Sequence, residues 1–114
     1  ACKQKISENE NVLSNNILKV LGNEILFKEL NFDKKKYFIG IRPENFDLSD
    51  NSEYKFSPKI ELIENLGNEK IIYVRLDEHQ LSAKISSEIK INKSFGFSLK
   101  NIFIFDENGK RIRS

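Results

Sequence analysis

The chain has 114 residues, enough for one small domain and too few for two independent hydrophobic cores. Hydrophobic residues make up 39% of the chain and charged residues 32%, which allows a small core beneath a charged surface. Nineteen basic residues offset seventeen acidic ones, so the net charge is +2, and both signs are mixed along the sequence. No basic and aromatic residues interleave in a recognisable nucleic-acid-binding pattern.

The ends of the sequence carry little information about compartment. No apolar run approaches the roughly 20 residues that cross a bilayer, and no signal-peptide pattern is present. The single cysteine, Cys2, cannot form a disulfide within the chain, and lipid attachment there requires that Ala1 be foreign to the natural protein. Because the chain does not begin with Met, we expect it to be a piece of a longer polypeptide.

Residues 1–16 are polar, and we expect them to form a flexible lead-in or an edge segment with one short strand. A hairpin follows, because the apolar runs 17–21 (ILKVL) and 24–30 (EILFKEL) flank the turn-forming dipeptide Gly22-Asn23.

The run 36–41 (KYFIGI) alternates, which places Tyr37, Ile39 and Ile41 on one face of a strand. A turn-rich stretch leads from there to the clearest hairpin in the chain. That hairpin consists of the runs KIELIENL and EKIIYVRL on either side of Gly67-Asn68.

Three further strands complete the pattern. In QLSAKI, the residues Leu81, Ala83 and Ile85 share a face. In 94–100 (SFGFSLK), the large apolar side chains share one face, and Gly96 lies on the opposite, small or polar face. The last strand, within NIFIFDENGKRI, ends in a Glu-Asn-Gly turn.

No window of eleven residues holds a helical period. Short strands that recur about every 8–12 residues predict an all-β protein. At this length the pattern fits a five- or six-stranded OB-like Greek-key β-barrel, with additional short strands. We expect the barrel to occupy residues 17–114.

The sequence offers little catalytic chemistry, and we do not expect an enzyme. His79 is the only histidine and has no second histidine to join it in a metal site, so a plain turn residue is favoured. Neither GxxxxGK[ST] nor GxGxxG occurs. Glu61 and Glu64 are three residues apart on an expected strand, so they point to opposite faces.

Three segments, in order, carry a resemblance to a known family: IGIRPENF (39–46), KIELIENLGNEKIIYVRL (59–76) and IFIFDENGKRI (102–112). They resemble the C-terminal regulatory domain, of the TOBE or OB type, in ATP-binding subunits of bacterial ABC importers. The branch is the one that imports maltose, other oligosaccharides and glycerol phosphate. The resemblance covers about residues 17–113, and Asn45 departs from the histidine that many relatives have at that position.

The resemblance implies a non-catalytic regulatory and dimerisation domain with an OB-type barrel. It binds no cofactor itself, whereas ATP and Mg are expected in an upstream domain of the parent subunit. The implied partners are that ATPase domain, a second copy of the subunit, the membrane permease subunits and a regulatory protein, but no nucleic acid. The implied location is the cytoplasmic face of the plasma membrane. The motif and interface candidates are Arg42, Pro43, Glu44, Glu64, Gly67, Asn68, Phe105, Asp106 and Gly109.

Pro43 lacks a backbone N–H, so it ends the preceding strand and holds Arg42 and Glu44 on a stiff turn. An intradomain salt bridge is favoured for this pair over a contact with the ATPase domain or a second subunit. Gly67 is expected at a turn that needs positive φ. An exposed Phe105 would indicate dimer packing.

Two alternatives to the regulatory domain stay open. A small-ligand sensor for oxyanions would need amide and hydroxyl groups that converge, with Lys93-Ser94 and Ser86-Ser87 as candidates. A single-stranded nucleic-acid binder would need exposed aromatic residues beside a basic groove, and the near-neutral charge argues against it.

Overall fold

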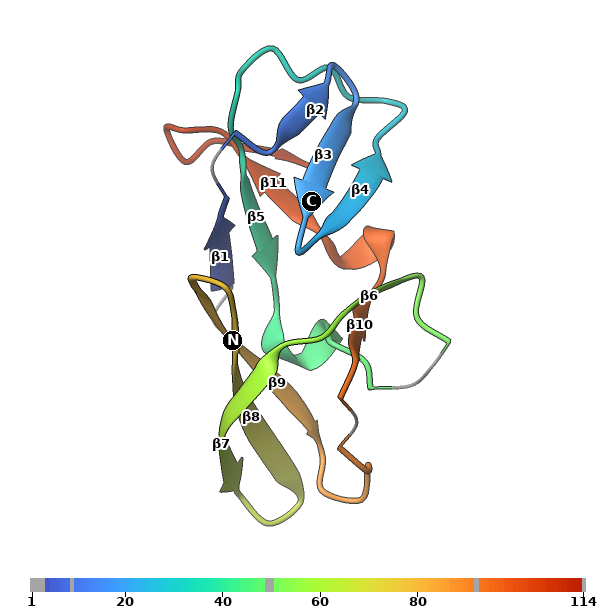
Figure 1. Ribbon diagram of the computed structural model, residues 1–114, viewed down its shortest axis with the longest axis vertical. Coiled ribbons are helices and arrows are strands. Elements are labelled where there is room, and N and C mark those ends of the chain that lie inside the picture. The colour runs from blue at the N-terminus through green and yellow to red at the C-terminus, as the bar shows by residue number, and fades with distance from the viewer. Residues whose placement is uncertain (1–3, 9, 49–50, 92, 114) are drawn as a thin grey trace.

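The computed structural model describes residues 4–8, 10–48, 51–91 and 93–113. Within these residues the chain forms short antiparallel strands and two 3-10 turns, without an α-helix, so the predicted all-β, OB-like class is confirmed. The molecule is elongated, with extents of 44 × 27 × 24 Å (Figure 1). The elements are β1 (Gln4–Ser7), β2 (Val12–Ser14), β3 (Ile17–Val20), β4 (Asn23–Leu26), β5 (Phe38–Ile41), η1 (Pro43–Asn45), β6 (Tyr54–Phe56), β7 (Lys59–Asn65), β8 (Glu69–Leu76), β9 (His79–Ser86), β10 (Phe95–Phe97), η2 (Leu99–Asn101), β11 (Phe103–Phe105) and β12 (Arg111–Arg113).

A four-stranded sheet in the order β1-β5-β11-β12 forms the centre of the molecule (Figure 1). Its inner face carries Ile6, Ile39 and Ile104, which lie side by side in register and are at most 1% exposed. The alternation predicted for residues 36–41, which form β5, is confirmed, because Tyr37, Ile39 and Ile41 are all buried. The strand is apolar on this face because burial of branched side chains stabilises the pleated surface.

The three-stranded sheet β2-β3-β4 covers the upper part of that inner face, and its Leu18 and Ile25 belong to the same core cluster (Figure 1). The first predicted hairpin is confirmed as β3–β4, but its turn lies one residue earlier than expected. Val20 pairs with Asn23, and the two loop residues, Leu21 and Gly22, have φ of 51° and 85°. Positive φ at both positions defines a type I′ turn, whose twist matches that of the strands.

The second predicted hairpin is confirmed as β7–β8, which with β9 forms a sheet that projects at the opposite end of the molecule (Figure 1). The β9 residues Leu81, Ala83 and Ile85 share a buried face, as predicted. His79 was expected in a turn but is the first residue of β9, directly after a turn in which Asp77 has φ of 54°.

The short β6–β10 pair closes the middle of the molecule with aromatic side chains. Phe56 lies 5.5 Å from Phe46 and 6.0 Å from both Phe95 and Phe97, between ring centroids. Gly96 is buried, and a Cβ there would collide with the Ser52 side chain and approach the Asp47 carbonyl, so it lies on a small and polar face opposite Phe95 and Phe97, as expected. The strand also ends early, because Leu99 begins η2.

The polar N-terminal segment contributes two edge strands, β1 and β2, where one was expected. Ile6 is 1% exposed, and so is Asn11, whose side chain forms two hydrogen bonds with the backbone of Tyr37. The considerations on Ala1 and Cys2 lie outside the described residues.

Candidate functional site

The Arg42-Pro43-Glu44 turn follows β5 of the central sheet and lies against the β7-β8-β9 sheet. Pro43 opens η1, and the carbonyl of Arg42 accepts a hydrogen bond from the Asn45 amide at 2.9 Å. The short turn packs against β9. It therefore fixes the direction in which the chain leaves β5.

Within the part of the chain that the structure describes, Arg42 and Glu44 form no ion pair, so the expected intradomain salt bridge is absent. The reason is geometric. Glu44 points from η1 into solvent, whereas the guanidinium carbon of Arg42 lies 5.7 Å from the ring centroid of Phe103. The Arg42 Nε is buried and has no hydrogen-bond partner among the described residues.

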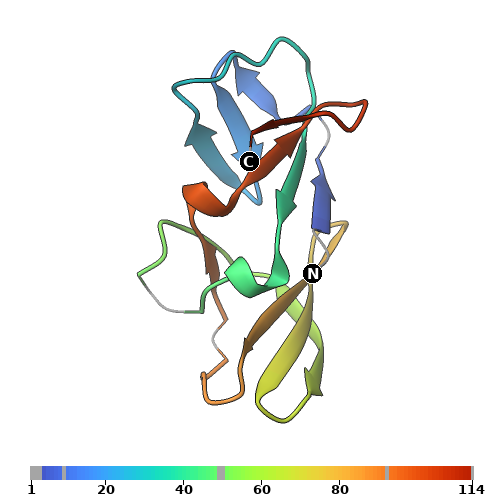
Figure 2. The same ribbon diagram turned by 180° about the vertical axis from the view of Figure 1, so that it is seen from behind.

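The outer face of the central sheet carries a row of aromatic rings. Phe105 pairs with Phe38 and Phe103 pairs with Gly40, so the three rings stand on the face opposite Ile39 and Ile104. This face is turned toward the reader in Figure 2, where β5 and β11 lie in front of the β2-β3-β4 sheet.

Four cations lie over these three rings. The distances to the ring centroids are 4.9 Å for Lys5 Nζ over Phe105, 5.0 Å for Lys36 Nζ over Phe38, and 5.7 and 5.8 Å for the guanidinium carbons of Arg42 and Arg111 over Phe103. Each distance falls within the cation–π range. We call these seven residues the basic–aromatic face.

Sequence reasoning missed this face because its members come from four separated segments. Only the strand register brings Lys5, Gly40 and Phe103 level with one another. The available signal was the alternation of Phe38, Gly40 and Arg42, which places the arginine on the face of the rings.

Phe105 is only 7% exposed. Its ring lies against the bare backbone of Gly40, where a Cβ would come within 2.9 Å of Phe105 Cε2. The exposure that would have indicated dimer packing is therefore absent, and an interface role for Phe105 stays a prediction.

Asp106 and Gly109 shape the turn between β11 and β12. The Asp106 carboxylate accepts hydrogen bonds from the amides of Asn108 at 2.9 Å and Lys110 at 2.8 Å. Gly109 has φ of 83°, a conformation that favours glycine. The expected Glu-Asn-Gly turn is confirmed, and Asp106 and Gly109 both stabilise it.

The other three candidates, Glu64, Gly67 and Asn68, lie on the β7–β8 hairpin, far along the molecule from the β11–β12 turn (Figure 1). Gly67 has φ of 93°, as predicted. Glu64 accepts a hydrogen bond of 3.0 Å from the Tyr73 hydroxyl, and this bond raises the pKa of Tyr73 above its ordinary value. The nine candidates thus lie in three places: at η1, near the β11–β12 turn and on the β7–β8 hairpin (Figure 1).

The same hairpin exposes large apolar side chains. Leu62 is 59% exposed, Leu66 55%, Ile63 45% and Tyr73 37%. Leu62 pairs with Tyr73 and shares its face, whereas Ile63 pairs with the buried Ile72 on the opposite face. We call Leu62, Leu66 and Tyr73 the apolar hairpin patch. β7 is also an edge strand, because it pairs only with β8 among the described strands. Clustered apolar exposure of this kind is typical of contact surfaces.

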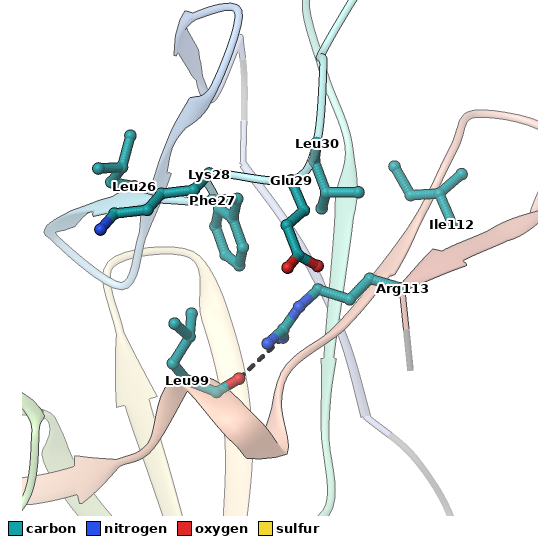
Figure 3. Close-up of a pocket in the computed structure, with 8 residues that line it drawn as sticks. All are labelled: Leu26, Phe27, Lys28, Glu29, Leu30, Leu99, Ile112 and Arg113. Carbon is teal, nitrogen blue, oxygen red and sulfur yellow. Dashed lines mark hydrogen bonds between the residues drawn. The ribbon is translucent and has the colours of Figure 1, made fainter.

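A pocket of about 500 Å³ lies between β4, η2 and β12 (Figure 3). Arg113 spans it, donates from Nη1 to the carbonyls of Leu99 and Ile102 at 2.8 Å, and lies over the Phe27 ring. Glu29 points toward Arg113, so the pocket holds charges of both signs (Figure 3). Its lining residues are Leu26, Phe27, Lys28, Glu29, Leu30, Leu99, Ile112 and Arg113.

The candidate oxyanion ligands line neither this pocket nor a smaller polar one bounded by Asn45, Glu53 and Lys100. In the described part of the chain, no group of three or more His, Cys, Asp or Glu residues is placed to hold a metal ion. None of the described helices is long and apolar enough to cross a membrane.

The chain is similar to the lactose transport ATP-binding protein LacK of Rhizobium radiobacter, with 27% identity over 85 residues. The match covers 66% of this chain, which spans only 22% of the relative's length. No protein-family model matches the chain. The relative is a lactose transport ATP-binding protein, and this likeness agrees with the coarser part of the sequence prediction, a relation to the ATP-binding subunit of an importer.

Proposed function

We propose that the chain is a non-catalytic regulatory and dimerisation domain of the TOBE or OB type. Its parent would be the ATP-binding subunit of an ABC importer for sugars or glycerol phosphate. The subunit would lie at the cytoplasmic face of the plasma membrane, with permease subunits and a regulatory protein as partners.

The observation that carries this proposal is the sequence similarity to a transport ATP-binding protein. The similar chain folds almost entirely into β-strands and turns. The phosphate-binding run GxxxxGK[ST] does not occur in the sequence. Nucleotide chemistry is therefore assigned to another part of the parent subunit, where ATP and Mg would bind.

The mechanism that we propose is mechanical. A barrel attached to each ATPase domain raises the local concentration of the two halves when the barrels bind one another. The two ATPase domains can then separate after ATP hydrolysis while the bound barrels keep the two subunits associated. The apolar hairpin patch supplies an exposed surface for such a contact.

The proposal is tested first by ATP turnover. The purified chain should release phosphate from Mg-ATP no faster than buffer alone. Turnover above buffer that survives repeated purification and follows the chain on a sizing column would contradict a non-catalytic domain.

A small-ligand sensor remains the second candidate, because the pocket of Figure 3 presents Arg113 between apolar walls. Molybdate or sulfate should then raise the melting temperature of the chain, and Arg113→Gln should remove the rise. The nearby Glu29 carboxylate disfavours anion binding here, so we expect no shift. A shift that Arg113→Gln abolishes would favour the sensor over the regulatory domain.

A further inference from the structure

The basic–aromatic face has cations without acidic partners. Lys5, Lys36, Arg42 and Arg111 form no ion pair and no side-chain hydrogen bond within the described residues. No described carboxylate lies within ion-pair distance of them. Asp106 Oδ1 accepts hydrogen bonds from two turn amides, and Glu44 is exposed on η1.

The charges on the β7-β8-β9 sheet are arranged differently. There, Arg75 pairs with Glu61 at 3.0 Å and Lys84 pairs with Glu69 at 3.4 Å. Opposite charges are thus paired across the β7-β8-β9 sheet, whereas the four cations of the basic–aromatic face form no ion pair among the described residues. A net charge of +2 over the whole chain conceals this local excess.

The face also holds its cations in place. Lys36 and Arg42 are half-buried, and each of the four cations rests on a ring. Less side-chain entropy is then lost when an anion binds. The two guanidiniums over Phe103 are planar forks suited to carboxylates.

The extent of the row decides the kind of ligand. The row extends from Lys36, two residues before β5, to Arg42, directly after it, and six extended residue steps span about 20 Å at ~3.3 Å per residue. A small oxyanion would reach only one end of it. An extended acidic segment of a protein would contact all four cations.

We propose that the basic–aromatic face is a docking surface for an acidic polypeptide segment, in which glutamate or aspartate side chains contact Arg42 and Arg111 and reach Lys5 and Lys36. A nucleic-acid strand fits less well. Bases need open ring faces for stacking, whereas these rings lie under the cations and Phe105 is 7% exposed. The inference does not depend on the transport role.

The test measures fluorescence anisotropy of a labelled peptide of alternating glutamate and serine, titrated with the chain at low ionic strength. The peptide should bind, its glutamine analogue should not, and added salt should weaken the complex. Arg42→Gln with Arg111→Gln should weaken binding about five- to tenfold, because two exposed ion pairs are lost.

The matched control removes the same two charges from the other sheet, in Arg75→Gln with Lys84→Gln, and should change the affinity less than about twofold. If the arginine variant fails to fold by circular dichroism, Lys5→Gln with Lys36→Gln replaces it, with the same expectation. Absence of peptide binding, or equal weakening by the control, overturns the proposal. So does a thymidine oligonucleotide that binds more tightly than the peptide and loses affinity in the arginine variant.

Discussion

At the residue scale, Gly40 shows how one missing side chain arranges the basic–aromatic face. Gly40→Ala would place a Cβ 2.9 Å from Phe105 Cε2 and 3.4 Å from Phe103 Cβ. We expect a loss of about 1–3 kcal/mol in the free energy of unfolding, measured by urea denaturation. Adding Phe105→Leu should make the alanine less costly than it is alone, because the clash is relieved. An alanine variant as stable as the parent would show that the ring does not rest on this backbone.

Also at the residue scale, Glu8 shows how burial shifts the pKa of a carboxyl group. Its Oε2 accepts a hydrogen bond from the Leu21 amide at 3.4 Å. Desolvation raises the pKa of Glu8 above its ordinary value of 4.5, despite the opposing effect of that bond. The folded protein therefore binds the proton more tightly than the unfolded chain. The resulting stability is present below pH 4.5 and is lost as the pH rises through the folded pKa.

Glu8→Gln should consequently stabilise the protein at pH 7, and the advantage should vanish as the pH falls to 4 and below. Melting temperatures across this range measure the difference, and the exposed Glu107→Gln is the control. A glutamine variant that gains stability only at low pH would reverse the sign and refute the assignment.

At the scale of an element, the N-terminal segment is held by an amide side chain. Asn11 Nδ2 donates to the Tyr37 carbonyl at 2.8 Å, and the Tyr37 amide donates to Asn11 Oδ1 at 2.9 Å. Asn11→Ala would leave both buried backbone groups without a partner and should cost about 2–4 kcal/mol. Hydrogen exchange at the Tyr37 amide should accelerate in step with that loss. The exposed Asn108→Ala should leave this amide unchanged, and an unchanged rate in Asn11→Ala would contradict the pinning role.

The elements also show what the sequence could and could not predict. Alternation in 36–41 and the glycines at 22 and 67 identified a strand and two hairpins, because these signals are local. The second edge strand was missed, since Gln4–Ser7 gains its order from pairing with β5 rather than from its own polarity. The basic–aromatic face was missed for the same reason. The salt bridge expected for Arg42 and Glu44 is absent because the two side chains leave the 3-10 turn in different directions.

At the scale of the whole molecule, the apolar hairpin patch is the surface on which we expect two copies to meet. Leu62→Asp with Leu66→Asp would place charges in an apolar contact and should weaken self-association by at least about tenfold. Sedimentation over a range of concentrations measures the effect. Leu13→Asp, at a residue 48% exposed on another sheet, is the matched control. A wild-type chain that stays monomeric, or a double variant that still dimerises, would exclude this patch as the subunit contact.

The central claim is that this domain belongs to the ATP-binding subunit of an importer. The most direct test is an immunoblot of source cells with an antibody raised against the chain. The account predicts a band several times heavier than 13.3 kDa that sediments with membranes and leaves them when the permease is removed. A band near 13.3 kDa, independent of any permease, would contradict it.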